Sequence, residues 1–427
     1  MTIMLIIFFV LLFLNMPVAF AIGISGVAYF FLADIPNSLA IQQFATGTQS
    51  FPLLAVPFFV LAGHILNASG ITSRLIKFAN DLTGHMIGGL AQASVLLSAM
   101  MGGISGSATA DAAMQSRIMT NDMLRRGYSK GFSTGLISVS SIITATFPPS
   151  IGLILYGFIG GVSINKLFIA GIIPGIILTL VLMISVYFVA KKNNYDQDNE
   201  FNPPTLKEVV ISFKDCIWAI LFPILLIIGI RFGLFSASEG GAVAVVYAMT
   251  VGFLFHKELT WKKLKICLKD AVTDNSMIML IIASASIFSY VIAFENFPRT
   301  MSQFVTGITQ NPQLLFLLIL LFVFIAGLFM EATANNLMLT PIFLPIAEMA
   351  GIDPVHFGVI LVVLITFGGM TPPLGVTMFA VLSITKTGVV EYTKGALPFI
   401  LTVLTVIILL AMFPSVVLFL PNLLLGP

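Results

Sequence analysis

Long apolar stretches recur along the whole chain, separated by shorter polar segments. Most of them approach the roughly 20 residues that a helix needs to cross a hydrocarbon core about 30 Å thick. A membrane barrel would instead show short segments of alternating polarity, which this pattern lacks. The pattern therefore predicts an all-α polytopic membrane protein, with spans near residues 3–32, 51–66, 131–159, 166–190, 216–232, 236–255, 276–294, 355–383 and 396–420.

Composition strengthens the membrane assignment. Hydrophobic residues make up 58% and charged residues 9% of the 427 residues, and the mean hydropathy is +1.06, whereas soluble domains carry about 25% charged residues. A net charge of +2 gives no indication of a nucleic-acid partner. Cys216 and Cys267 lie far apart without metal-binding neighbours, and no phosphate-binding loop is present, so neither a metal centre of cysteines nor ATP coupling is predicted. Since no basic region precedes the first apolar segment, it is predicted to be a span rather than a signal peptide.

Basic residues decide how two further apolar stretches, 86–119 and 313–350, are interpreted, because they accumulate on cytoplasmic loops. If both stretches are re-entrant hairpins, which enter and leave on one side, all but three of the 20 basic residues fall on one face. A full crossing at 86–119 would place Lys77 opposite Arg125 and Arg126. We therefore predict a first hairpin that opens to the cytoplasm and a second that opens to the periplasm, with the N-terminus inside and the C-terminus outside.

An internal repeat explains why the hairpins form a pair. The segment "GSATADAA" at 106–113 resembles "MEATANNL" at 330–337, an offset of 224 residues. The pairs Pro148-Pro149 and Pro372-Pro373 have the same offset. An odd number of predicted crossings separates the repeats, so the second is inverted. Inverted repeats over 51–190 and 275–420, with broken helices, are typical of secondary transporters.

Each proline pair interrupts a predicted span. Proline lacks an N–H donor and breaks a helix, and irregular backbone at membrane depth persists only where it lines a cavity or is buried in protein. Freed carbonyl oxygens suit a hard cation such as Na+, and nearby hydroxyls add oxygen ligands. The candidates are Thr144, Thr146, Ser150, Thr366 and Thr371. A simple kink is the alternative for one pair alone, but two pairs at symmetric positions favour ion sites.

The tip of the first hairpin, "MGGISGSATADAAMQ", places Asp111 in an apolar stretch. An acid at membrane depth is costly and indicates a functional site, and Ser107 precedes it by one helical turn. A packing seam of small residues is the alternative, but it does not account for the acid. Two helix N-termini that meet at the tips would favour an anionic group. The second tip carries Glu331, Thr333, Asn335 and Asn336.

With these residues the chain resembles the large membrane subunit of tripartite ATP-independent periplasmic (TRAP) transporters over essentially its whole length. The motifs that carry the resemblance are "GGISGSATADAA", "FPPSIGLILYG", "MEATANNLMLTPIFLPIAEMAGIDPVHFGV" and "TPPLGVTMFA". The resemblance implies an elevator-type ion transporter fold in the bacterial inner membrane and Na+-coupled uptake of an organic anion delivered by a periplasmic binding protein. It also implies a smaller four-helix membrane subunit as partner, and no enzymatic activity. Similarity leans toward the sialic acid (N-acetylneuraminate) branch, with C4-dicarboxylates and other sugar acids left open.

Carried over to this chain, the resemblance implies at least two Na+ sites and one anion site between the hairpin tips. The first Na+ site would involve Ser105, Ser107, Thr144, Thr146 and Pro148. The second would involve Gly327, Thr366, Gly369, Met370 and Thr371. The substrate would lie near Thr109, Asp111, Ser150, Glu331 and Thr333. Because Glu331 stands where the first tip has Ser107, the two sites need not be equivalent.

The same interpretation divides the chain into five parts. Scaffold helices and a first arm occupy 1–85, one half of a transport domain 86–190, a linker with scaffold helices and a second arm 191–312, the other half 313–395, and a C-terminal helix 396–427. The amphipathic segments 70–85 and 295–309 are the arms, with ordinary connecting helices as the alternative. The alternative function is a self-sufficient Na+/anion symporter or antiporter without a binding protein. An intramembrane enzyme would have only Asp111 and Glu331 as its acids.

Overall fold

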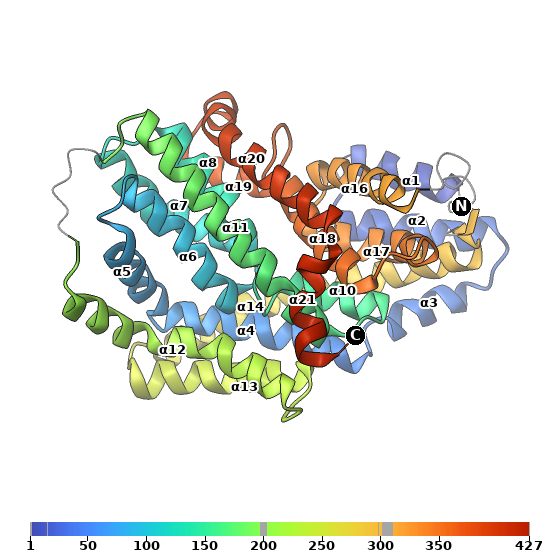
Figure 1. The fold of residues 1–427 in the computed structure, drawn as a ribbon. Helices are drawn as coiled ribbons and strands as arrows, with labels where there is room; N and C mark the ends of the chain where they lie inside the picture. Colours follow the sequence, from blue (N-terminus) through green and yellow to red (C-terminus); the bar gives the residue numbers. More distant parts are fainter. Residues whose placement is uncertain (1, 15, 197–202, 298, 301–310, 427) are drawn as a thin grey trace.

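The computed structural model describes residues 2–14, 16–196, 203–297, 299–300 and 311–426 (Figure 1). Over these residues the chain is built of helices and contains no β-strand. Seven of the described helices are long and apolar enough to cross a membrane, or eight if the bent pair within 130–160 counts as one span. Helices suit a bilayer because the backbone N–H and C=O groups in the interior of a helix bond to one another. The predicted polytopic α-helical architecture is confirmed.

The N-terminal apolar segment forms two helices, so the single span predicted over 3–32 is wrong. α1 (Thr2–Phe13) and α2 (Val18–Leu32) pack against each other, and Pro17, which has no N–H, precedes the second. Their 12 and 15 residues give about 18 and 22 Å of helix, shorter than a hydrocarbon core of about 30 Å. The prediction of a cytoplasmic N-terminus depended on that single crossing and is therefore no longer supported. In Figure 1 both helices lie at the right, at the end opposite α5 (Ile71–Thr83).

The C-terminal segment predicted as one span over 396–420 is also interrupted. α20 (Val389–Met412) ends before Phe413, whose φ of −119° and ψ of 76° are not helical, and α21 (Pro414–Leu425) starts at a proline. Proline suits a first helical position because the N–H there has no partner within the helix. The interruption lets α21 pack across α11 (Ile164–Lys192). α20 itself continues across the predicted domain boundary between residues 395 and 396.

The two halves of the chain contain matching elements in the same order. The hairpins are α6 (Gly89–Ser105) with α7 (Ala108–Arg125), and α16 (Pro312–Phe329) with α17 (Ala332–Met349). Adding 224 to the bounds of α7 gives the bounds of α17. The broken spans correspond likewise: α8 (Lys130–Ser140), α9 (Ile142–Thr146) and α10 (Ile151–Gly160) in the first half, α18 (Pro354–Gly368) and α19 (Val376–Thr385) in the second. The predicted hairpins and broken helices are confirmed.

The two hairpins lie at opposite ends of the molecule. α6 and α7 are at the left of Figure 1, and α16 and α17 are at the right. Lys77 of α5 lines the same cleft as Arg125 and Arg126 at the end of α7. The basic residues on both sides of the first hairpin therefore share one end of the protein, as expected for a chain that enters and leaves on the same side. The repeats are inverted.

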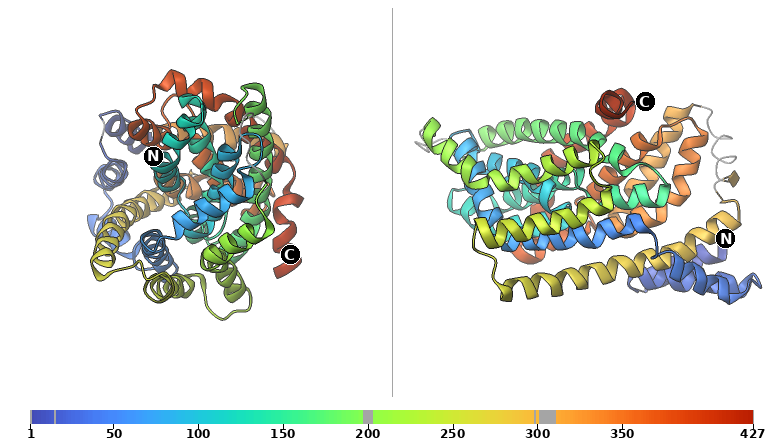
Figure 2. Two further views of the ribbon diagram at one scale, coloured as in Figure 1. Left: turned by 90° about the vertical axis from the view of Figure 1, so that its left-hand side faces the viewer. Right: turned by 90° about the horizontal axis from the view of Figure 1, so that it is seen from below.

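The helices can be described as two groups, which contact each other where α14 (Trp261–Phe294) packs on α17 and α4 (Ala55–Ala68) packs on α6. The first gathers around the long helix α14 and includes α2, and Figure 2 shows α14 running beside the N-terminal helices. Its other members are α3 (Asn37–Thr46), η1 (Phe51–Leu54), α4, α13 (Ala237–Thr250) and the π-helical turn η2 (Val251–Phe255). The second group contains the hairpins, the broken spans, α11 and α20.

The first predicted arm is the helix α5, which lies between the groups. It packs on α6 on one side and on α12 (Leu206–Arg231) on the other. Ile71, Leu75 and Phe78 are buried on one side of the helix, so the segment is amphipathic, as its sequence indicates. The second predicted arm, 295–309, lies mostly outside the described residues.

Candidate functional site

The first broken span changes direction at the proline pair. α9 ends at Thr146, the next residue, Phe147, has an extended backbone with φ −72° and ψ 139°, and the helices on the two sides meet at 46°. The peptide bond within each proline pair is cis. Ser150 caps α10 and donates a hydrogen bond to the carbonyl of Ala145 at 2.6 Å. The buried hydroxyl of Ser150 therefore links the two sides of the break.

The tip of the first hairpin presses directly against this break. Gly106 has a left-handed backbone with φ +58°, and a Cβ there would lie 2.5 Å from the carbonyl oxygen of Pro149. A Cβ on Gly102 would lie 2.6 Å from the Cβ of Phe147. Only glycine allows both the turn and this close approach. Next to the tip, the Oγ of Ser105 is buried and has no hydrogen-bond partner within the described residues.

Asp111 is 1% exposed and sits in a hydrogen-bond network between the hairpin and the broken span. Its Oδ2 accepts hydrogen bonds from the hydroxyls of Ser98 and Thr144, both at 2.8 Å. The Nε2 of Gln115 donates to both carboxylate oxygens, at 3.1 and 3.0 Å. A buried carboxylate requires such partners. Asp111 thus fastens α7 to α6 and α9 and faces the inside of its own half.

The second broken span is closed by a tight turn after Gly368. A Cβ on Gly368 would lie 2.6 Å from the carbonyl carbon of Gly327 in α16, so hairpin and span touch backbone to backbone. The carbonyl of Gly369 accepts from the N–H of Met378 at 3.1 Å, and that of Met370 accepts from the hydroxyl of Tyr392 at 2.7 Å. Each carbonyl has two lone pairs, so one remains on each oxygen. Thr366 and Thr371 donate to carbonyls within their own span.

The tip of the second hairpin is capped by a carboxylate. Glu331 accepts hydrogen bonds from the N–H of Thr333 at 2.7 Å and of Ala334 at 3.2 Å, and from the Thr333 hydroxyl at 3.0 Å. It therefore compensates the positive end of α17. Asn335, which corresponds to Asp111 at the repeat offset, donates to the carbonyls of Ala326 and Met330 at 3.1 and 3.2 Å. The second tip is held by its own backbone.

The two halves exchange contacts at their centre. The hairpin helix α7 packs on α19 of the other half, and α17 packs on α10. Thr109 and Thr377 share a hydrogen bond of 2.8 Å across the first contact. Asn336 donates to the carbonyl of Gly152 at 2.7 Å across the second. Each hairpin is thereby fixed to the broken span of both repeats, and the four elements form one interlocked unit.

The structure brings most of the sequence-predicted residues to these two junctions but gives them different roles. The hydroxyl of Thr144 donates a hydrogen bond to Asp111, and the hydroxyl of Ser105 is buried next to the tip. The hydroxyl of Thr146 instead donates to the carbonyl of Ile142 within its own helix. The carbonyl of Thr146 lies against Gly171 of α11. The sequence interpretation missed several participants, namely Ser98, Gln115, Thr377 and Tyr392. Only Gln115 carried a local signal, since it follows Asp111 by one helical turn.

Comparison with known proteins agrees with this architecture. The family "Tripartite ATP-independent periplasmic transporter, DctM component" matches residues 5–416. The chain is 36% identical over 417 residues to the sialic acid TRAP transporter large permease protein SiaM of Vibrio cholerae, covering 97% of both chains. It is 34% identical to the 2,3-diketo-L-gulonate TRAP transporter large permease protein YiaN of Escherichia coli, covering 95% of both. It is 35% identical to the C4-dicarboxylate TRAP transporter large permease protein DctM of Pseudomonas aeruginosa, covering 94% of both.

The fold also resembles a solved transporter. The YdaH transporter of Alcanivorax borkumensis, described as having an unusual topology, superposes with a TM-score of 0.61 at 15% identity, covering 91% of this chain and 89% of that one. Similarity at this identity concerns the fold alone. The family match covers residues 5–416 and therefore includes both hairpins and both broken spans. The chain therefore belongs to the DctM family, the multi-pass inner-membrane large permeases of tripartite ATP-independent periplasmic transporters, and is not an enzyme.

Proposed function

We propose that this chain is the transporting permease of a Na+-coupled importer of an organic anion, supplied by a periplasmic binding protein and assembled with a small four-helix membrane subunit. N-acetylneuraminate is the first candidate substrate, with C4-dicarboxylates and other sugar acids as alternatives. Relatives are named for sialic acid, 2,3-diketo-L-gulonate and C4-dicarboxylate, which all carry a carboxylate. One is named for isethionate, a sulfonate. The shared negative charge supports an anion as the substrate class.

The observation that carries the cation part of the proposal is the buried hydroxyl of Ser105. A buried hydroxyl without a hydrogen-bond partner costs about 1–3 kcal/mol, and a bound cation would offset that cost. Gly106 presses the tip against the carbonyl of Pro149, and the prolines contribute no N–H. The junction is therefore rich in oxygen atoms and poor in donors, which suits Na+.

The second junction supports a second cation site. Gly327 and Gly368 let α16 approach the broken span closely, next to the carbonyls of Gly369 and Met370. Both carbonyls keep a lone pair after their hydrogen bonds to Met378 and Tyr392. Thr366 and Thr371 keep acceptor capacity on their hydroxyls as well. We assign these residues to the second Na+ site.

The anion is proposed to bind nearer to the first tip than to the second. Ser107 caps α7 with a neutral hydroxyl, so the positive end of that helix remains available to an anion. At the second tip Glu331 already compensates the helix end. Ser150 and Thr109, which lie beside the first tip, supply hydroxyl groups for orientation. In an elevator movement the interlocked unit would slide past the helices around α14, carrying both ions and substrate.

Transport in proteoliposomes tests the proposal. The chain is reconstituted with its small subunit, and uptake of N-acetylneuraminate, a C4-dicarboxylate and a further sugar acid is measured while Na+ and the binding protein are varied independently. We expect uptake only with an inward Na+ gradient and the binding protein present. Uptake that needs neither would contradict the proposal. Uptake that needs Na+ but no binding protein would favour the alternative, a self-sufficient symporter or antiporter.

A further inference from the structure

The joint between α4 and the arm helix α5 is short and tightly built. α4 ends at Ala68 and α5 begins at Ile71. Only Ser69 and Gly70 therefore join the two helices. Gly70 has a left-handed backbone with φ +73°, and a Cβ there would overlap a carboxylate oxygen of Glu258. Glycine is thus required at this joint both for the turn and for the close approach of Glu258.

Side chains from the chain that follows η2 bind successive carbonyls at the end of α4. Lys263 of α14 donates a hydrogen bond to the carbonyl of Ala68 at 3.4 Å. The Nδ1 of His256 lies 3.0 Å from the carbonyl oxygen of Ser69, and because a carbonyl only accepts, that nitrogen is the donor. The last carbonyls of a helix lack partners within the helix and carry partial negative charge. These donors therefore fasten the end of α4 to the start of α14.

Arg74, in the first turn of α5, extends the same attachment to the arm. Its Nη1 donates to the carbonyl of Gly70 at 2.8 Å, and its Nη2 pairs with Oε1 of Glu258 at 2.7 Å. The side chains of Arg74 and Glu258 are 27% and 41% exposed, so water screens this pair less than a fully exposed one. Since Glu258 lies between η2 and α14, the near end of α5 is tied to the first group of helices.

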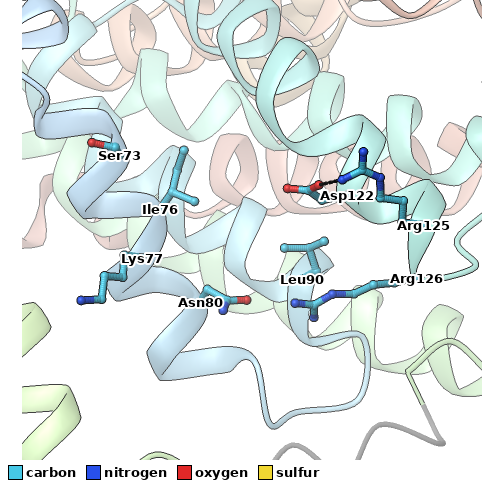
Figure 3. Close-up of a pocket in the computed structure, with 8 residues that line it drawn as sticks. All are labelled: Ser73, Ile76, Lys77, Asn80, Leu90, Asp122, Arg125 and Arg126. Carbon is cyan, nitrogen blue, oxygen red and sulfur yellow. Dashed lines mark ion pairs between the residues drawn. The ribbon is translucent and has the colours of Figure 1, made fainter.

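The far end of α5 is attached to the second group instead. The hydroxyl of Thr83 donates to the carbonyl of Gly89, at the start of α6, at 3.2 Å. In the turn between them, a Cβ on Gly88 would lie 2.7 Å from the Cβ of Ala190 in α11. α5 packs on α6, and a cleft of about 420 Å³ lies between α5 and the end of α7 (Figure 3). The arm therefore runs from one group of helices to the other.

We propose that the joint at Gly70, held by the Arg74–Glu258 pair, is the fixed pivot about which α5 swings when the interlocked unit moves. The inference rests on the proposed function, in that this unit moves relative to the helices around α14. A hinge concentrates a large change of backbone angle in a few residues.

The length of the arm shows what such a pivot does. α5 has 13 residues and is therefore about 20 Å long. A rotation of about 30° at Gly70 would move the far end of α5 by about 10 Å. Arg74 lies one turn from Gly70 and would move by only about 3 Å. The pair with Glu258 can therefore persist throughout the swing and keep the near end in place.

Distances between spin labels in the full complex test the proposal. The chain is reconstituted with its small subunit in liposomes, with Cys216→Ala and Cys267→Ser so that only added cysteines carry labels. A label at Met277→Cys on α14, where the side chain is 63% exposed, is paired with Ser73→Cys near the pivot or with His85→Cys beyond the far end of α5. Distances are measured in KCl, in NaCl, and in NaCl with N-acetylneuraminate.

We expect the distance to His85→Cys to shift or broaden by about 10 Å in at least one condition, and the distance to Ser73→Cys by about 2 Å. Equal spreads at the two positions in every condition would overturn the proposal. Uptake with and without Na+ judges the proposed function separately. A moving far end without Na+-coupled uptake would support the pivot and contradict the proposed function, whereas Na+-coupled uptake with equal spreads would remove the pivot alone.

Charge reversals test whether the ion pair itself holds the pivot. Arg74→Glu and Glu258→Arg each bring like charges together, and each should broaden the distance to Ser73→Cys about twofold. The combined Arg74→Glu/Glu258→Arg restores opposite charges and should return the distance to that of the unaltered protein, because residues in contact are energetically coupled. The matched control is Asp122→Arg, which reverses a charge in the exposed pair that Asp122 forms with Arg125 on α7 (Figure 3).

Two outcomes of these variants would overturn the role of the pair. One is a combined variant that stays as broad as the single reversals, and the other is single reversals that stay as narrow as Asp122→Arg. Glu258→Gln is included in case the reversals do not fold, because it removes the charge and keeps the size of the side chain. It should broaden the distance to Ser73→Cys by a smaller factor, and an unchanged distance would again contradict the proposal.

Discussion

The two hairpins share one backbone plan but hold their tips in different ways. In the first, Asp111 on α7 accepts hydrogen bonds from Thr144 of the broken span and from Ser98 of α6. In the second, the corresponding Asn335 donates to carbonyls of its own hairpin. The first tip is thus fastened to its broken span by an acidic side chain, while the second touches its span through glycine backbone. The two repeats share a fold, but different side chains hold their hairpin tips in place.

The N-terminal residues that cap α7 and α17 also differ. A neutral Ser107 caps α7, whereas the carboxylate of Glu331 caps α17. Since a helix N-terminus carries about half a positive charge, the first tip can attract an anion and the second is already compensated. Under the proposed function, both junctions would hold a cation, whereas only the first tip would suit an anionic substrate.

The largest effect is expected when the first tip is given the charge of the second. Ser107→Glu would place a carboxylate at the end of α7, where the proposed substrate binds. Like charges brought together cost several kcal/mol, so initial uptake of the anion should fall about 100-fold. Ser107→Thr keeps the hydroxyl and serves as the control. Normal uptake by Ser107→Glu would remove the anion site from the first tip.

The next largest effect concerns Asp111 and Asn335, which occupy corresponding positions in the two repeats. Asp111→Ala should lower the free energy of unfolding by about 3 kcal/mol, because it removes the carboxyl group that accepts hydrogen bonds from Ser98, Thr144 and Gln115. Asn335→Ala should cost about 1–2 kcal/mol, since only neutral hydrogen bonds are lost. Denaturant titration of the purified complexes measures both. Equal costs would show that the two tips are held alike.

A smaller effect is expected at the first cation site. Ser105→Ala removes a hydroxyl that has no hydrogen-bond partner within the described residues, so stability should change little. Loss of one cation ligand should raise the Na+ concentration for half-maximal uptake about tenfold. Thr134→Val is the matched control, because the hydroxyl of Thr134 donates to its own helix at Lys130, at the end of α8 away from the break. A Na+ response altered equally in both variants would remove Ser105 from the site.

The smallest effect is expected for the cap of the second hairpin. Glu331→Gln should lower the free energy of unfolding by about 1 kcal/mol, the usual contribution of an N-cap, and leave the apparent KM for substrate within about twofold. Uptake across a range of substrate concentrations, alongside denaturant titration, measures both quantities. A large rise in KM at unchanged stability would place Glu331 on the substrate and contradict the comparison between the tips.

Local sequence patterns predicted the main elements because their causes are local. Apolar length predicts a span, proline removes a backbone donor, and glycine permits a tight turn, so the hairpins, the broken helices and the 224-residue repeat could be read without a structure. Two predicted spans were wrong because each apolar segment was taken as one helix although the helix is interrupted within it. Residues 3–32 and 396–420 are mostly apolar, but each contains a point at which the helix stops.

The sequence by itself therefore determined the class of protein, its inverted repeats and the two places where helices break. The tertiary structure alone decided which groups meet at those places. Ser98 approaches Asp111 from an earlier helix, Thr377 meets Thr109 from the other repeat, and Lys77 joins Arg126 around one cleft. Such partners are separated by many residues along the chain, and a hydrogen bond depends on distances of about 3 Å. Only the packing of the interlocked unit sets those distances.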